Sequence, residues 1–260
     1  MASLADRTIA ALRAHHDELA GLIPILTDAQ LTGPSGASEW SVAQVLSHLG
    51  SGAEIGLVAY QIALTDRAEP EADFNQGVWD RWNAMSPQDQ ANGFLEHDAR
   101  LLETIESLTP DQRANLQIKL SFLPAPLGIA TIAGMRLNEV AHHSWDVRVG
   151  LDPAATLHEE AAAVLLEQLS GELGFMLRFT GKADALASPA VVDALGYGLV
   201  IADEVSLAPS SESANATFAG PTEALVRLFG GRLKPAHTPE AVEVTGDVSL
   251  DDLRSVFPGF

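Results

Sequence analysis

The sequence contains no cysteine and few basic residues, and both shortages restrict what the protein can do. Without cysteine it has no disulfide, no thiolate nucleophile of its own and no cysteine-ligated zinc site. Any metal ion must therefore bind to nitrogen and oxygen donors. Lys and Arg number 15 against 35 Asp and Glu, for a net charge of -20. This charge repels phosphate backbones and anionic lipid headgroups, so we expect neither nucleic acid nor a membrane as a partner.

The sequence also has no long uninterrupted apolar run, and its first residues do not show the pattern expected of a secretory leader. The longest apolar stretch, residues 122–135, is broken by Pro124 and Pro126 and is shorter than the roughly 20 residues of a membrane-spanning helix. The first residues lead into an amphipathic pattern without a basic segment and an apolar segment before it. With 47% hydrophobic residues in a chain of 260, proper cores can form. We therefore expect a globular, cytoplasmic protein.

The first 150 residues contain four long helical patterns. They cover residues 4–23, 41–64, 86–108 and 128–149. Ser41 and Gln44 form the capping-box pattern of a helix start, and Ser86 followed by Pro87 supplies an N-cap with proline in the first turn. Four such helices predict an antiparallel bundle, with extended segments at about residues 65–85 and 109–127 crossing its ends. The polar segment 65–85 is expected to be loop-like.

The pattern of apolar residues changes after residues 151–153, where Leu-Asp-Pro interrupts the helical periodicity. Thr156 to Glu159 resembles a capping box for a further helix that reaches about Phe179. Strand-like runs then occur at residues 205–207, 214–218 and 242–244. Helices are expected from Gly220-Pro221 to Gly230-Gly231, and from Ser249 to Phe257. These features predict a bundle domain over residues 1–153 and a small α+β domain over residues 154–260.

Three residues of the predicted bundle form a candidate metal site. Glu139 and His143 are four residues apart in one helix, so their side chains project from the same face. His48 lies in another long helix, on a side flanked by apolar residues. Two imidazoles and a carboxylate suit zinc, nickel, cobalt or ferrous iron, and they leave coordination positions open for water or substrate.

The spacing alone leaves two alternatives open. Glu and His at this spacing also occur by chance, and a single His on an apolar face is usually a hydrogen-bonded core residue. Because His142 precedes His143, and i,i+3 pairs are nearly as close as i,i+4 pairs, either imidazole is able to face Glu139. Asp146 is a candidate to orient a ligand imidazole, with a surface role equally open.

The remaining aromatic and histidine residues considered are not expected to take part in metal binding or catalysis. We expect Trp145 to be a packing residue. His15, His16 and His97 are expected on solvated helix faces, without a functional role.

Three sequence segments around these candidates resemble one known family. The segments are residues 40–42 (Trp-Ser-Val), 45–49 (Val-Leu-Ser-His-Leu) and 139–147 (Glu-Val-Ala-His-His-Ser-Trp-Asp-Val). Together they are similar to the DinB-like superfamily, and specifically to the mycothiol-dependent maleylpyruvate isomerase family. The resemblance implies that His48, Glu139 and His143 bind a divalent metal, with zinc as the first choice and nickel, cobalt or iron as alternatives.

The resemblance extends into the second half of the chain, through residues 216–220, 225–232 and 242–247. It implies an α+β protein in which a DinB-like four-helix bundle precedes a smaller, sterol-carrier-like α+β domain. The isomerases of the family use an Arg of this second domain at the active site. We favour Arg232 over Arg227 because Arg232 follows a glycine-flanked helix end. The alternative is a cation that stabilises the helix C-terminus.

The function implied by the resemblance is thiol activation. A free thiol has a pKa of about 8.5, and coordination to a divalent metal lowers it enough to give thiolate at neutral pH. The family implies mycothiol as the thiol and a small-molecule electrophile as substrate, with the protein acting as an isomerase or a thiol S-transferase. The alternative is a non-catalytic protein that binds a metal or an apolar ligand. A monomer and a homodimer both fit the sequence.

Overall fold

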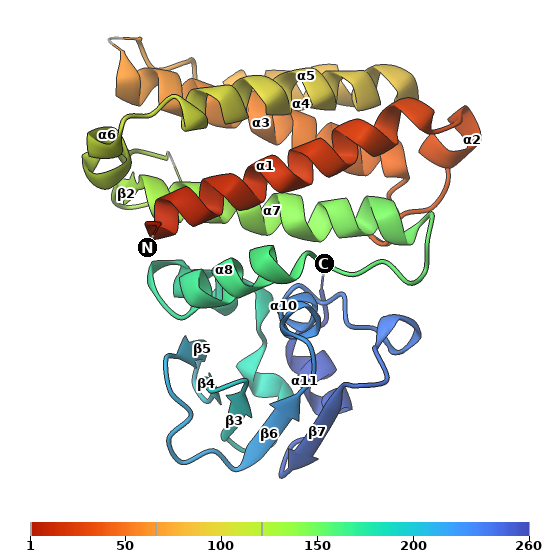
Figure 1. Cartoon of the computed structure of the whole chain (residues 1–260), viewed down its shortest axis with the longest axis vertical. Coiled ribbons are helices and arrows are strands. Elements are labelled where there is room, and N and C mark those ends of the chain that lie inside the picture. Colours follow the sequence, from red (N-terminus) through yellow and green to blue (C-terminus); the bar gives the residue numbers. More distant parts are fainter. Residues whose placement is uncertain (1, 66, 121, 260) are drawn as a thin grey trace. The chain divides into compact units, whose positions relative to one another are not determined.

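The computed structural model describes residues 2–65, 67–120 and 122–259, and the chain divides into two compact units. One unit ends at Ala155 and the other begins at Thr156. The first is helical, and the second combines helices with a sheet (Figure 1). The predicted fold class is confirmed, whereas the domain limits of 1–153 and 154–260 stay a prediction. No described helix has the length and apolar character needed to cross a membrane.

Four long helices build the described part of the first unit. They are α1 (Leu4–Leu22), α3 (Val42–Leu64), α5 (Pro87–Glu106) and α7 (Ile129–Val149). Both α1 and α3 pack against both α5 and α7, so the four helices surround one core (Figure 1). The predicted capping box at the start of α3 is present, because Ser41 Oγ accepts a hydrogen bond from the backbone N–H of Gln44. Large apolar side chains fill the interior, each contributing roughly 1.5–3 kcal/mol by burial.

Shorter elements connect the long helices of this unit. They are η1 (Ile23–Ile25), α2 (Asp28–Leu31), α4 (Phe74–Asn83), α6 (Pro110–Asn115) and the paired strands β1 (Gln117–Ile118) and β2 (Leu127–Gly128). The prediction of an extended segment for residues 109–127 is therefore wrong over α6, and that of a loop for residues 65–85 is wrong over α4. Tertiary packing explains this helix: Trp82 is buried, its indole N–H donates to Glu54 on α3 over 2.9 Å, and its ring lies where a side chain at Gly50 would be.

Three histidines of the bundle lie elsewhere than expected. His15 and His16 are buried, and His97 is half-buried with its Nδ1 3.7 Å from Glu54. The expectation of solvated helix faces is wrong because each of these imidazoles fills space between helices. His16 belongs to a buried polar network, in which its Nδ1 lies 2.9 Å from Asp98 Oδ2.

Arg136 completes this network. Its Nη2 lies 2.6 Å from Asp98 Oδ1 and also donates to the carbonyl oxygen of Leu49 over 3.0 Å. Because Arg136 is on α7, Asp98 on α5 and Leu49 on α3, one guanidinium joins three of the long helices.

The second unit contains a five-stranded sheet with the strand order β5-β4-β3-β6-β7. Its strands are β3 (Ala190–Ala194), β4 (Tyr197–Ile201), β5 (Val205–Ala208), β6 (Ala216–Ala219) and β7 (Glu243–Gly246). Strands β3 and β6 pair in parallel, and the other neighbours are antiparallel. The helices of this unit are α8 (Glu159–Leu169), α9 (Leu177–Thr180), α10 (Thr222–Phe229) and α11 (Leu250–Val256), with short 3-10 turns η2 (Glu172–Met176), η3 (Ala183–Ala185) and η4 (Pro235–His237).

The start and end of α8 differ from the prediction. His158, not Thr156, is its N-cap, and the carboxylate of Glu159 accepts hydrogen bonds from the backbone N–H groups of Thr222 and Glu223 at the start of α10. The helix ends at Leu169 and not near Phe179. A capping box therefore does not form, because the acidic side chain serves the neighbouring helix.

The Asp98 network leads to a prediction for stability. Replacing Asp98 with Asn should lower the free energy of unfolding by about 3–5 kcal/mol, because the largely enclosed Arg136, whose side chain is 12% exposed, loses its charged partner. Urea denaturation measures the change. The control is Glu96→Gln, which removes an exposed carboxylate of the same helix that lies 3.8 Å from Arg100. It should cost no more than about 0.5 kcal/mol. An Asp98→Asn variant as stable as the control would contradict the role of the network.

The same carboxylate predicts how stability depends on pH. Burial raises the pKa of Asp98, but the charge of Arg136 and the hydrogen bond to His16 outweigh burial and lower it. Its contribution to stability is complete above the unfolded-state pKa of about 3.9 and is lost as the pH falls through the lower folded-state pKa. Between about pH 5 and pH 2, the free energy of unfolding should therefore fall more steeply for the wild type than for Asp98→Asn. Equal slopes in urea titrations would refute this assignment.

Candidate metal centre

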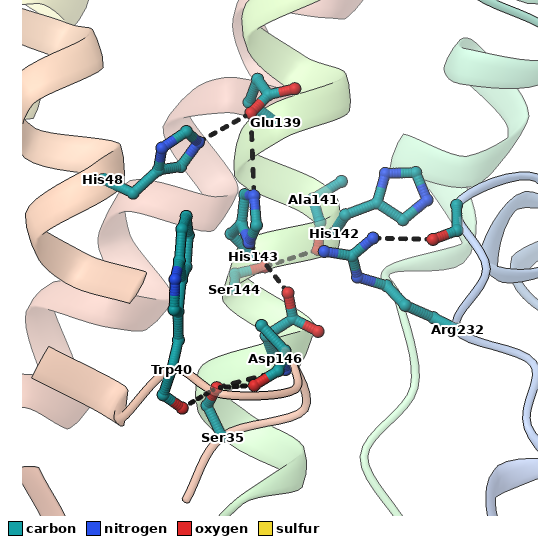
Figure 2. A network of polar contacts seen from close by, with 12 residues as sticks. Ser35, Trp40, His48, Glu139, Ala141, His142, His143, Ser144, Asp146 and Arg232 are labelled. Carbon is teal, nitrogen blue, oxygen red and sulfur yellow. Dashed lines mark hydrogen bonds and ion pairs between the residues drawn. The ribbon is translucent and has the colours of Figure 1, made fainter. Parts of the chain in front are cut away.

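The structure brings His48, Glu139 and His143 together between α3 and α7. Nε2 of His48 lies 3.0 Å from Glu139 Oε2, and Nε2 of His143 lies 3.7 Å from the same oxygen. The two imidazole rings have centroids 4.8 Å apart and meet edge to face. Figure 2 shows both rings turned toward the Glu139 carboxylate. Three potential ligand atoms, one from each residue, all lie within 4.8 Å of one another.

Asp146 orients His143. Its side chain is fully buried, and its Oδ2 lies 2.8 Å from His143 Nδ1. Because a carboxylate only accepts, Nδ1 of His143 carries a proton, and Nε2 is the ring atom that faces Glu139 (Figure 2). Such a carboxylate on the second ring nitrogen is the usual support of a metal-binding histidine. Of the two roles considered for Asp146, the structure therefore places it in the orienting one.

The neighbouring His142 turns elsewhere. Its Nδ1 lies 2.9 Å from the carbonyl oxygen of Asn138, one turn back along α7. The ambiguity between the two adjacent imidazoles is thereby resolved geometrically, since His143 belongs to the convergent group and His142 does not. Trp145, on the same helix, is buried and donates its indole N–H to the carbonyl oxygen of Ala155 over 2.8 Å, which agrees with a packing role.

The electrostatics keep Glu139 ionised. Burial by itself raises the pKa of this carboxyl, but the hydrogen bond from His48 and the charge of the nearby imidazoles when protonated outweigh it and lower the pKa to about 2. Glu139 is therefore a carboxylate at neutral pH. Since it then only accepts, Nε2 of His48 donates its proton to it. A metal ion would bind in place of that proton.

The donor set fits a divalent ion. A tetrahedral zinc ion with bonds of about 2.0–2.1 Å holds its donor atoms roughly 3.3 Å apart. The distances of 3.0 and 3.7 Å from Glu139 Oε2 to the two Nε2 atoms lie on either side of this value. The His48 and Glu139 side chains keep 41% and 42% of their surface exposed, so the site is open on one side.

Trp40 is a feature of this site whose role sequence reasoning missed. In the sequence, Trp40 is only the first residue of one of the motifs. In the structure its indole lies beside both imidazoles, with ring centroids 5.2 Å from His48 and 6.0 Å from His143 (Figure 2). The sequence feature that could have indicated this role is its position two residues after the segment 32–38, which is rich in Gly, Pro and Ser, and eight residues before His48.

The two candidate arginines of the second unit, Arg227 and Arg232, differ in their surroundings. Arg227 is buried in α10, where it forms a bidentate ion pair with Glu223 and donates to the carbonyl oxygen of His237. Arg232 is half-buried after the end of α10, and its Nη1 donates to the carbonyl oxygen of Gly230 over 2.8 Å. Arg227 thus has a structural task, and Arg232 stays the predicted active-site cation.

The geometry predicts which histidine the metal requires. His48→Ala should weaken zinc binding by at least about 100-fold, because it removes one of three ligands while leaving the core intact. Competition with a chromophoric chelator measures the affinity. The matched control is His142→Ala, which removes the adjacent imidazole outside the convergent group and should bind zinc as the wild type does. Loss of zinc in the control alone would contradict the assignment.

Asp146 allows a subtler change. Asp146→Asn should weaken zinc binding by about 10–100-fold, because an amide no longer holds His143 in the required tautomer and orientation. Isothermal titration with zinc measures this loss. Circular dichroism of the metal-free variant serves as the control for the fold. An unchanged affinity would show that Asp146 does not support the site.

Comparisons with known proteins agree with this picture. The model of the mycothiol maleylpyruvate isomerase N-terminal domain matches residues 12–148. The fold is similar to two crystal structures of mycothiol-dependent maleylpyruvate isomerase, one of them a variant with a single His replaced by Ala. Their TM-scores are 0.63 and 0.64, each at 15% sequence identity, and the match covers 95% of this chain and 98% of those. No curated protein matches significantly.

At this identity the structural likeness shows the fold alone, and it agrees with a helical unit followed by one that contains a sheet. The family is shown by the domain match, which spans more than half of the chain and includes His48, Glu139 and His143. The resemblance seen in the sequence motifs is thereby confirmed. The chain belongs to the mycothiol maleylpyruvate isomerase family.

Proposed function

We propose that the protein is a divalent-metal- and mycothiol-dependent enzyme that isomerises a small cis-unsaturated acid of the maleylpyruvate type. The observation that carries the proposal is the convergence of His48 Nε2, Glu139 Oε2 and His143 Nε2 at a site that is open on one side. Three protein ligands with an open position are typical of a catalytic metal, whereas structural sites are closed by four.

Each residue of the centre has a distinct task in this proposal. His48 and His143 present neutral nitrogen donors, and Asp146 holds the second one in the required tautomer. Glu139 contributes a negative charge that the low pKa maintains. When bound, the metal would hold the thiol as a thiolate at neutral pH. That thiolate could add to an activated double bond, allow rotation about the resulting single bond, and leave again as the double bond re-forms.

The absence of cysteine supports an external thiol. The chain contains no sulfhydryl group, so the nucleophile has to arrive as a small molecule. The family description names mycothiol. We therefore propose mycothiol as the thiol and zinc as the first metal to test, since two imidazoles and one carboxylate are a common zinc set.

Arg232 is the proposed partner of the substrate carboxylate. A guanidinium forms two parallel hydrogen bonds with a carboxylate and stabilises negative charge that develops during addition. Arg227 is less suited to this task, because its guanidinium is buried against Glu223. In a protein with a net charge of -20, an anionic substrate requires such a local cation.

The decisive experiment uses purified zinc-loaded protein with mycothiol and maleylpyruvate. We expect fumarylpyruvate, detected by chromatography, with mycothiol recovered unchanged. Reactions without mycothiol, without metal, or with His48→Ala should give no product. A stable mycothiol adduct in place of the trans acid would indicate an S-transferase. Failure of mycothiol to bind in calorimetry, with or without metal, would indicate a non-catalytic binding protein.

The role of Arg232 has its own test. Arg232→Ala should lower kcat/KM for the carboxylate substrate by about 100-fold, because the lost contact is a charge-assisted one that strengthens in the transition state. Its zinc affinity should stay that of the wild type. Arg178→Ala, which removes an exposed cation paired with Glu204, is the control and should not change kcat/KM. Full activity of Arg232→Ala would refute the assignment.

A further inference from the structure

The indole of Trp40 lies beside the two imidazoles of the candidate metal centre. The plane of its ring is 25° from that of His143 and 47° from that of His48. The centroid of the indole lies 5.2 Å from that of His48 and 6.0 Å from that of His143, and both distances are within the range of attractive aromatic contacts. Trp40 is nevertheless 39% exposed, so burial alone does not account for its placement.

Trp40 lies in a loop whose conformation is fixed by hydrogen bonds. The two ends of this loop, residues 33–41, are joined by a hydrogen bond from the backbone N–H of Val42 to the carbonyl oxygen of Gly33. Within it, the hydroxyl and the backbone N–H of Ser35 both donate to the carbonyl oxygen of Trp40, over 2.8 and 3.2 Å. The loop conformation therefore determines where the indole ring lies.

The same loop packs against α7 beside Asp146. The backbone N–H of Gly36 donates to the Asp146 carbonyl oxygen over 2.8 Å. A Cβ atom at Gly36 would lie 2.6 Å from Val149 Cγ1 and 2.8 Å from Asp146 Oδ1, so only glycine fits this contact. A Cβ at Gly150 would likewise lie 2.5 Å from the carbonyl oxygen of Pro34. The loop thus contacts the residue that orients His143 and leads directly into the helix that carries His48.

We propose that Trp40 is a positioning residue of the metal centre. The loop 33–41, which packs on α7, places the Trp40 indole against His48 and His143, and the indole holds both imidazoles in the orientation that an ion requires. The proposal rests on the proposed metal centre. Trp40 restricts rotation of each ring about its side-chain bonds and so lowers the entropy that the ligands lose on binding an ion. It stacks on the imidazole of His143 and meets that of His48 at a tilt.

Cobalt binding tests the proposal without any substrate. Trp40→Leu keeps an apolar side chain but removes the flat ring, and it should weaken Co²⁺ affinity by about 10–100-fold, the effect typical of residues that support a ligand. The visible absorption bands of bound Co²⁺, which report coordination geometry, should shift as well. Trp40→Phe, which restores a ring, should recover most of the affinity.

Two further variants separate positioning from general packing. Trp79→Leu makes the same change at a tryptophan that is 44% exposed on α4, and it should bind Co²⁺ as the wild type does. Gly36→Ala keeps Trp40 but displaces the loop and also crowds the Asp146 carboxylate, so it should weaken Co²⁺ binding at least as much as Trp40→Leu. Co²⁺ should also quench tryptophan fluorescence in the wild type, and Trp40→Phe should lose most of that quenching.

The outcomes distinguish this inference from the proposed function. If wild-type protein fails to bind Co²⁺ or Zn²⁺, the metal centre itself is refuted. If the wild type binds and Trp40→Leu binds within about threefold of it with an unchanged spectrum, the centre stands and the positioning role of Trp40 is overturned. Thermal unfolding of the metal-free variants shows whether any lost affinity merely reflects unfolding, in which case Trp40 is a packing residue and the proposal fails.

Discussion

The register between α3 and α7 depends on a contact that lies outside the metal centre. Arg136 of α7 donates to the carbonyl oxygen of Leu49, the residue after His48, and pairs with the buried Asp98 of α5. It precedes Glu139 by three residues, about one helical turn. Because a largely enclosed guanidinium with fixed partners cannot shift without losing charge pairing, this contact holds the two ligand-bearing helices at the level where their side chains meet.

Two carboxylates of α7 show how environment separates roles within one helix. Glu139 keeps 42% of its side-chain surface exposed and shares its oxygen with two imidazoles, which suits a metal ligand. Asp146 is fully buried and bonded to the far nitrogen of His143, which suits an orienting group. Their chemistry is nearly the same, so position relative to the imidazole decides the role of each.

Several elements were missed because tertiary contacts create them. Helix α4 forms around Trp82, whose ring and indole N–H are satisfied by α3. Strands β3 and β4 were not predicted, since their hairpin turns at Leu195 and Gly196, both at positive φ, without the Asn-Gly or Asp-Gly pair that marks such turns. The polar network around His16 was also not predicted, because its hydrogen-bonded pairs are 38 to 87 residues apart.

The amino-acid sequence by itself determined the four long helices, the capping box at Ser41 and the shared face of Glu139 and His143. All of these follow from backbone geometry within a few residues, which is a local property. Only the tertiary structure decided that His48, 91 residues from Glu139, comes within 3.0 Å of it. It also decided that His143 and not His142 faces this carboxylate, and that the loop before α3 brings Trp40 against both imidazoles. These distances depend on how helices and loops pack against one another, and no local pattern encodes them.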